Sequence, residues 1–199
     1  MPKPKTKAPK IIALKSFWDG EPDDAFTFAR YNWEAGRGVR ESIAPKILAK
    51  RRPAAKEGRI DTAERVEVLL PADAPQIYAD VDFLVQNFEE AYPVDESLAL
   101  AQVTLRFEDA PNLHSPYEKA RAWARAEYVE GRGLPLILVL HAPFRMGSDN
   151  PPHAHAMILS RQLTRFGWGK IDRQLGTDRD RESARASWLA DLRGSLAPR

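Results

Sequence analysis

Residues 134–170 read LPLILVLHAPFRMGSDNPPHAHAMILSRQLTRFGWGK and contain three of the four histidines of the chain. One apolar run ends at His141, and a second apolar run begins at His153 after a polar loop. Two short apolar runs bounded by turn residues predict neighbouring strands that return on one another. Because side chains alternate along a strand, His153 and His155 share one face, and the return places that pair beside His141. We therefore expect three imidazoles to meet at one end of a sheet.

Three converging histidines predict a metal site. Neutral imidazole is the commonest protein ligand of metal ions, and three such ligands leave a divalent ion with open coordination positions. The chain has no cysteine, so disulfides and thiolate ligands are excluded, and any metal must be held by histidine, carboxylate or water. The alternative is that the three histidines merely lie near the end of a strand.

The same residues carry a resemblance to a known family. The stretch resembles relaxases of the MobA/MobL type, within the HUH endonucleases, in the order of its motifs. These are H-A-P, a loop with N-P, H-A-H-A-M-I, an arginine and F-G-W-G-K. The resemblance is clearest over 134–170, extends more weakly to 185–189 and is loose elsewhere.

The resemblance implies a function. A relaxase makes site- and strand-specific nicks in DNA and transfers the strand during plasmid mobilisation and conjugation. The family pattern implies a divalent metal ion, Mg or Mn, held by His141, His153 and His155, which polarises the scissile phosphate. A tyrosine then attacks to leave a 5′-phosphotyrosine link. The implied partners are single-stranded origin DNA and accessory mobilisation proteins.

Tyr31 is the candidate catalytic nucleophile. We expect a strand over 11–18 and then a helix over 23–35, in which Tyr31 lies on an aromatic face. Residues 29–36 resemble the family's early helix, although the glycine spacing is not the same. All five tyrosines precede His141, which suits relaxases with an N-terminal nucleophile. The competing interpretation is that an aromatic side chain at helical spacing belongs to the core.

Basic residues predict the contacts with DNA. The net charge of +2 alone does not argue for nucleic acid, so the distribution of charge is more informative. Lysines recur in residues 1–10, which we expect to form a disordered basic arm, and a second cluster includes Lys50, Arg51 and Arg52. With Arg161, which we expect to follow the H-x-H pair on the same strand, these three are the predicted DNA-binding residues, although solvated loops look the same in sequence.

The order of elements in the rest of the chain predicts an α+β fold, and the resemblance implies that residues 11–199 form a single relaxase-like nuclease domain. We expect an antiparallel HUH/ferredoxin-like sheet backed by helices, because strand, helix, strand, strand over 98–163 is the order of a split βαβ unit. The predicted strand and helix over 65–92 and those over 98–129 both resemble the family's strand and helix before its H-A-P strand. One of the two pairs must be an insertion, which leaves the strand order open. No run approaches membrane-spanning length and no signal peptide is evident, so we expect a cytoplasmic protein.

Further elements follow from periodicity and turn residues. The predicted strands and helices outside the histidine region are strands over 65–70 and 98–107, and helices over 74–92, 116–129 and 178–192. Residues 166–170 predict a hairpin tip that Trp168 pins into the core, or alternatively a surface on which a substrate strand stacks.

Two other functions fit parts of the sequence. An H-x-H-x-H nucleotide hydrolase uses a nucleophilic histidine at the third position, but this chain has Met157 there. A non-catalytic DNA- or metal-binding module would keep the histidines without a working tyrosine. The position of Tyr31 relative to His153 and His155 discriminates between the enzyme and the module.

Overall fold

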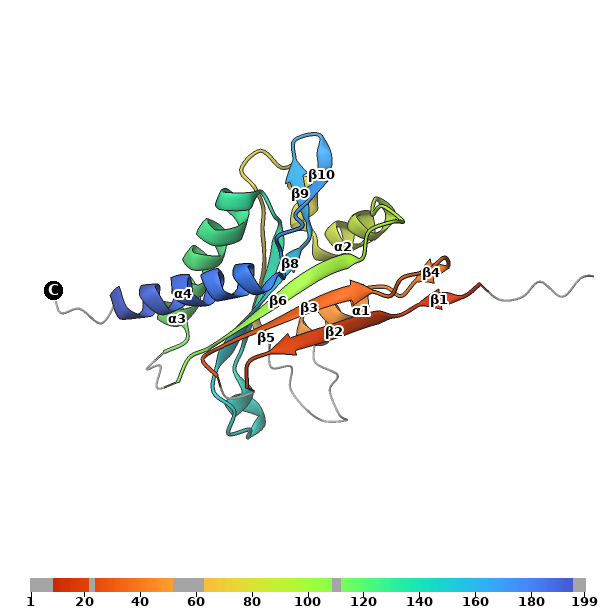
Figure 1. Cartoon of the computed structure of the whole chain (residues 1–199). Coiled ribbons are helices and arrows are strands. Elements are labelled where there is room, and N and C mark those ends of the chain that lie inside the picture. The colour runs from red at the N-terminus through yellow and green to blue at the C-terminus, as the bar shows by residue number, and fades with distance from the viewer. Residues whose placement is uncertain (1–8, 22–23, 52–62, 109–111, 195–199) are drawn as a thin grey trace, which may run out of the picture.

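The computed structural model describes residues 9–21, 24–51, 63–108 and 112–194. Most of the predicted basic arm, together with Arg52, lies outside these ranges. Six strands form one sheet in the order β2-β3-β6-β8-β7-β5, and every neighbouring pair is antiparallel (Figure 1). The six strands are β2 (Leu14–Asp19), β3 (Phe26–Trp33), β5 (Ala63–Leu69), β6 (Leu98–Arg106), β7 (Leu136–His141) and β8 (His153–Leu159).

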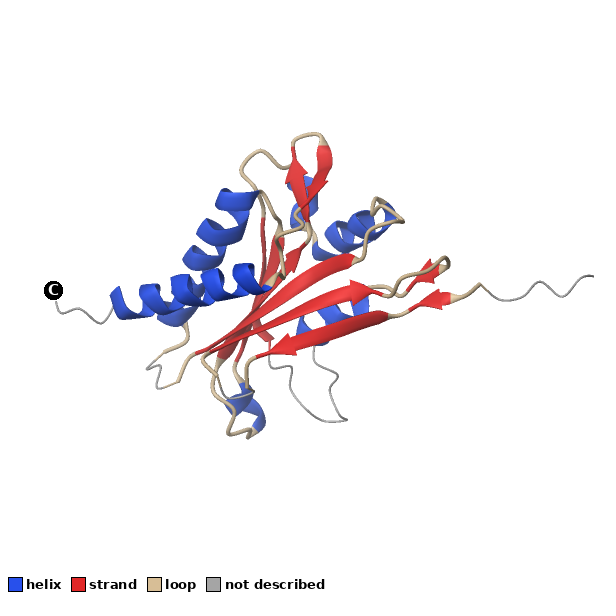
Figure 2. Cartoon of the chain, in the orientation of Figure 1, coloured by secondary structure: helices blue, strands red, loops and turns tan. Residues whose placement is uncertain are grey.

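Helices cover both faces of this sheet, which confirms the predicted α+β class (Figure 2). On the face that we call the α3–α4 face lie α3 (His114–Ala124), its π-helical continuation η2 (Arg125–Glu130) and α4 (Asp178–Gly194). On the opposite α1–α2 face lie α1 (Ala44–Arg51), η1 (Gln76–Ala79), α2 (Val81–Glu90) and the hairpin of β9 (Arg161–Thr164) and β10 (Gly167–Ile171).

Three short elements complete the described chain. They are a parallel pair of β1 (Ile11–Ile12) with β4 (Val39–Arg40), and η3 (Pro143–Met146) between β7 and β8. Within the described ranges, no helix has the length and apolar character needed to span a membrane.

The connection from β6 through α3 to β7 is the predicted split βαβ unit. Both strands are antiparallel to β8 and lie on either side of it, so they are parallel to each other with one strand between them. The order that the sequence left open is also settled. Of the two competing strand–helix pairs, the earlier one supplies β5, which pairs with β7 at the edge of the sheet.

The predicted helix over 23–35 is wrong, because Phe26–Trp33 is the strand β3. Phe26 and Phe28 pack on the α3–α4 face, whereas Tyr31 and Trp33 pack on the α1–α2 face. A strand buried on both faces loses the apolar–polar alternation that marks a strand in sequence. The aromatic residues then fell by chance at helical spacing, although their enrichment favours a strand.

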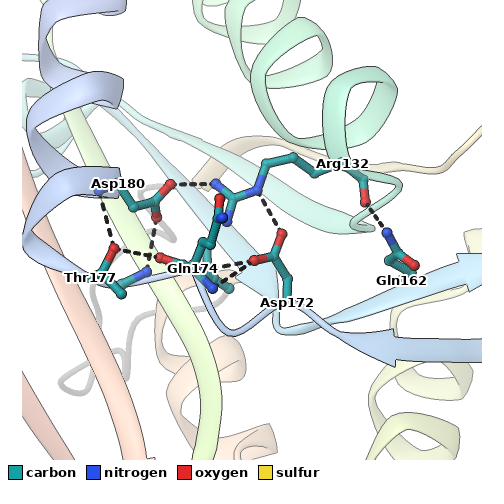
Figure 3. A network of polar contacts seen from close by, with 8 residues as sticks. Arg132, Gln162, Asp172, Gln174, Thr177 and Asp180 are labelled. Atoms are coloured by element: carbon teal, nitrogen blue, oxygen red, sulfur yellow. Dashed lines mark hydrogen bonds and ion pairs between the residues drawn. The ribbon is translucent and has the colours of Figure 1, made fainter.

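A polar network ties the start of α4 to the end of η2 (Figure 3). Arg132 donates from Nε to Asp172 at 2.8 Å and also pairs with Asp180, while its carbonyl accepts from Gln162 at 3.0 Å. Asp180 accepts in addition from the backbone N–H of Gly176. All three charged side chains are mostly buried, so the network fixes α4 against the base of the β9–β10 hairpin.

Candidate functional site

The three predicted histidines meet at one end of the sheet. His141 is the last residue of β7 and lies directly opposite His153, the first residue of β8, while His155 follows two residues later on the same face. The ring centroids are 5.2 Å apart for His141 and His153, 5.1 Å for His141 and His155, and 4.8 Å for His153 and His155. We call these three residues the histidine cluster.

The spacing of these rings suits a shared metal ion. Three ring nitrogens at about 2.0–2.1 Å from one tetrahedral ion place the ring centroids about 5 Å apart. The His141 and His153 rings are nearly parallel, with 26° between their planes. No group of three or more histidines and carboxylates among the described residues is already arranged to hold a metal. Metal binding therefore stays a prediction.

The Nδ1 atoms of the two β8 histidines have polar neighbours. His153 Nδ1 is 2.9 Å from the Pro151 carbonyl, which can only accept, so this nitrogen carries the proton and Nε2 keeps its lone pair. His155 Nδ1 is 2.9 Å from Thr104 Oγ1 and 3.3 Å from Gln102 Nε2. Such neighbours orient metal-binding imidazoles in many proteins.

Sequence reasoning missed Gln102 and Thr104. Both lie on the central strand β6, which reads LALAQVTLR, and Thr104 pairs directly with His155 on β8. The signal was present, because Gln102, Thr104 and Arg106 place a polar side chain at every second position of an otherwise apolar strand. Polar groups on one face of a buried strand need partners, and that requirement points to a polar site.

Burial and nearby positive charge keep the two β8 histidines neutral. Burial lowers the pKa of His155 well below its ordinary value, and the positive charge of Lys50 lowers it further. Burial also lowers the pKa of His153, an effect that the Pro151 carbonyl opposes and that Arg106 and Lys50 reinforce. The pKa of Lys50 is itself lowered by burial. Neutral imidazole is the form that binds a metal, so the environment favours the ligand state.

Tyr31 lies behind the histidine cluster. It is only 5% exposed on the α1–α2 face, and its hydroxyl donates to Gln102 Oε1 at 3.2 Å. Gln102 in turn contacts His155, so one side chain separates the tyrosine hydroxyl from the imidazole. Burial raises the pKa of Tyr31, which disfavours the phenolate. The other four tyrosines lie elsewhere, with Tyr117 and Tyr128 on the α3–α4 face and Tyr78 and Tyr92 among the α2 contacts.

The predicted DNA-binding residues separate into two groups. Lys50, near the end of α1, lies close enough to shift both β8 histidines, whereas the side chain of Arg51 is not described and Arg52 lies outside the described residues. Arg161 was expected on the same strand as His155, but β8 ends at Leu159 and Arg161 begins β9. Its guanidinium donates to backbone carbonyls, Gly169 at 3.0 Å among them. A phosphate contact by Arg161 would have to compete with these bonds.

A groove lies apart from the histidine cluster. It has a volume of about 810 Å³ and is lined by Trp33, Arg40, Glu89 and Tyr92, among others. The Arg40 guanidinium stacks 4.6 Å from the Trp33 ring and 5.0 Å from the Tyr92 ring, so the aromatic floor is already covered by a cation. Size alone therefore does not identify the functional site, and the concentration of neutral histidines is more informative.

Comparison with known proteins gives one informative result. A solved structure described as "Molecular Basis of Vancomycin Resistance Transfer in Staphylococcus aureus" has a similar fold, with a TM-score of 0.57. The match covers 68% of this chain and 71% of that chain at 19% sequence identity. At this identity the likeness shows that the two proteins share a fold. No family model matches the chain, and no curated protein sequence matches it.

Proposed function

We propose that this protein is a relaxase-like DNA nickase and strand transferase that acts in plasmid transfer. The observation that carries the proposal is the meeting of three histidines at one sheet end, with the Tyr31 hydroxyl joined to His155 through Gln102. The similarity of the fold to a structure concerned with the transfer of vancomycin resistance supports a role in DNA transfer. The MobA/MobL type rests on the sequence resemblance.

In the proposed reaction each residue has a defined task. His141, His153 and His155 supply neutral nitrogens to a divalent ion, which when bound withdraws charge from the scissile phosphate. Lys50 neutralises a phosphate oxygen beside the cluster. The Tyr31 oxygen forms a bond to phosphorus, its proton passes to solvent, and the DNA 3′-oxygen leaves and is protonated. The phosphotyrosine retains the energy of the broken bond, so a 3′-hydroxyl can reverse the step without ATP.

The burial of Tyr31 favours a second candidate, a DNA- or metal-binding module without nicking activity. Its hydroxyl is committed to Gln102, and its raised pKa opposes the phenolate that attack on phosphorus requires. Catalysis by Tyr31 therefore requires the side chain to leave its buried position. The nucleotide hydrolase is disfavoured, because Met157 at the third position is fully buried and offers no nucleophile.

One experiment separates the two candidates. The protein is incubated with a panel of single-stranded origin oligonucleotides and Mn²⁺, and a covalent protein–DNA band is sought on a denaturing gel. We expect Tyr31→Phe to eliminate this band while costing about 1 kcal/mol of stability, the usual value of one hydrogen bond. Tyr78→Phe is the matched control, because it also removes one tyrosine hydrogen bond on the same face.

The outcomes point in different directions. A band that persists in Tyr31→Phe would show that Tyr31 is not the nucleophile. Wild-type protein that binds the oligonucleotides and forms no band on any of them would favour the binding module.

A further inference from the structure

We infer that Thr104 is a positioning residue that holds the proton of His155 on Nδ1 and so leaves Nε2 free to bind a metal. This inference rests on the proposed metal site and adds a residue to it. Thr104 and His155 face each other across β6 and β8, and the hydroxyl lies 2.9 Å from Nδ1. The sheet register itself sets this distance, because the two residues are a directly paired position.

Hydrogen-bond accounting shows why Thr104 is needed. A neutral imidazole carries one proton, so Nε2 has a lone pair for a metal only when Nδ1 is the protonated nitrogen. Two side-chain atoms contact Nδ1, namely Thr104 Oγ1 and Gln102 Nε2. The amide nitrogen has no lone pair to offer and can only donate. Of these two contacts, Thr104 is therefore the one that can accept the Nδ1 proton.

Gln102 favours the opposite tautomer of His155. The Tyr31 hydroxyl donates to its Oε1, which turns its Nε2 toward Thr104 and His155. From that position Gln102 offers a proton to Nδ1, which would stabilise the tautomer that carries its proton on Nε2. Removal of the Thr104 hydroxyl should leave this donor unopposed and should shift His155 to the form that cannot bind a metal.

The same arrangement occurs at His153, where the Pro151 carbonyl faces Nδ1 at 2.9 Å. A carbonyl has no proton to donate, so His153 must already be in the metal-binding tautomer. With Thr104 as the acceptor at His155, both histidines of β8 keep a lone pair on Nε2 that can bind a metal. Acceptors of this kind behind metal-binding histidines typically contribute 10- to 100-fold in affinity, about the size of effect expected here.

The chain offers a closely matched control in Thr27. It lies on β3 directly opposite Thr104, and both residues are 3% exposed. The buried Thr27 hydroxyl has no hydrogen-bond partner in the part of the chain that the structure describes. A threonine-to-valine change replaces the hydroxyl with a methyl group at either position and keeps the shape of the side chain. Only the change at Thr104 removes a contact with an imidazole.

The test compares three variants, Thr104→Val, Thr104→Ser and Thr27→Val, with the wild type. The tautomer of His155 is read from imidazole ¹⁵N chemical shifts of metal-free protein at about pH 8, where histidine is neutral. Affinity for Mn²⁺ alone is measured by calorimetry. We expect the Nδ1-protonated form in the wild type and in Thr104→Ser, the Nε2-protonated form in Thr104→Val, and a Mn²⁺ affinity about 10- to 100-fold weaker in Thr104→Val only.

Three results would overturn the inference. They are a wild-type His155 protonated on Nε2, a Thr104→Val protein with unchanged tautomer and affinity, and an equal loss of affinity in Thr27→Val. The chemical shifts require no metal. A protein that binds no Mn²⁺ therefore contradicts the proposed metal site, while the role of Thr104 in setting the tautomer is judged separately from the shifts.

Discussion

Three histidines at one sheet end differ in what surrounds them. His155 is nearly enclosed at 6% exposure and His141 at 4%, whereas His153 is half-buried. Burial of an imidazole disfavours its charged form, and it lowers the pKa of both His153 and His155, so these two side chains stay neutral beside one another. This property, more than the mere count of histidines, makes the cluster suited to a divalent ion.

Metal affinity should depend on each of these side chains. We expect His153→Ala or His155→Ala to abolish Mn²⁺ binding, because two remaining neutral ligands hold a divalent ion too weakly. Calorimetry measures the affinity, and circular dichroism checks that the protein stays folded. His114→Ala is the control, since His114 is exposed at the start of α3. Unchanged affinity in either cluster variant would exclude the three-histidine site.

The sequence predicted the histidine cluster because its geometry is local. Only a loop separates His141 from His153, and the alternation of a strand places His155 on the same face. The partners of these histidines depend on distant pairing. Thr104 reaches His155 only because β6 lies beside β8, which no local pattern specifies. The polar alternation of β6 marked Thr104 as unusual but could not identify its partner.

At the scale of elements, helices with one exposed face and the buried strands β6, β7 and β8 were predicted correctly, whereas the buried strand β3 was predicted as a helix. The helices α2 and α4 have one apolar stripe each, and both were predicted from it. The strand β3 packs against helices on both sides, so its periodicity vanished and a helix was predicted instead. That error also misplaced Tyr31, which lies within the sheet and not on a helix.

The polar network around Arg132, which ties the start of α4 to the end of η2, can be tested through the charge of Asp172. Burial of Asp172 alone would raise its pKa, but the hydrogen bond and charge of Arg132, with two backbone N–H groups, outweigh burial and hold the pKa below its ordinary value. The stabilisation is therefore complete above the unfolded pKa of about 3.9 and is lost as the pH falls through the folded pKa.

We expect Asp172→Asn to cost about 2 kcal/mol at pH 7, the value of a charge-assisted hydrogen bond. The stability curves of the variant and the wild type should begin to converge below about pH 4 and meet only below the lowered pKa of folded Asp172, where the wild-type carboxylate is protonated in both states. Urea unfolding across pH measures both effects. Asp178→Asn is the control, since that side chain is 84% exposed. Parallel curves for wild type and Asp172→Asn would show that the network contributes nothing dependent on charge.

At the scale of the whole molecule, the position of the histidines predicts which face meets DNA. The cluster lies on the α1–α2 face, and Lys50 of α1 is close enough to influence both β8 histidines. The opposite face carries its own exposed cations, among them Lys119 on α3 and Arg179 and Arg185 on α4. The small net charge of +2 cannot distinguish the faces, so local charge must do so.

Salt dependence of DNA binding tests this assignment. Each phosphate contact with a single strand contributes about 0.7 to the slope of log affinity against log salt, because binding releases counterions. We expect the combined change of Lys50, Arg51 and Arg52 to alanine to weaken binding and to reduce that slope by about 2. The matched control changes Lys119, Arg179 and Arg185 to alanine, which removes the same charge from the opposite face. Fluorescence anisotropy with a labelled single-stranded oligonucleotide at several salt concentrations gives both slopes. An equal reduction in the control would mean that net charge governs binding, and an unchanged slope in the first variant would remove the end of α1 from the DNA interface.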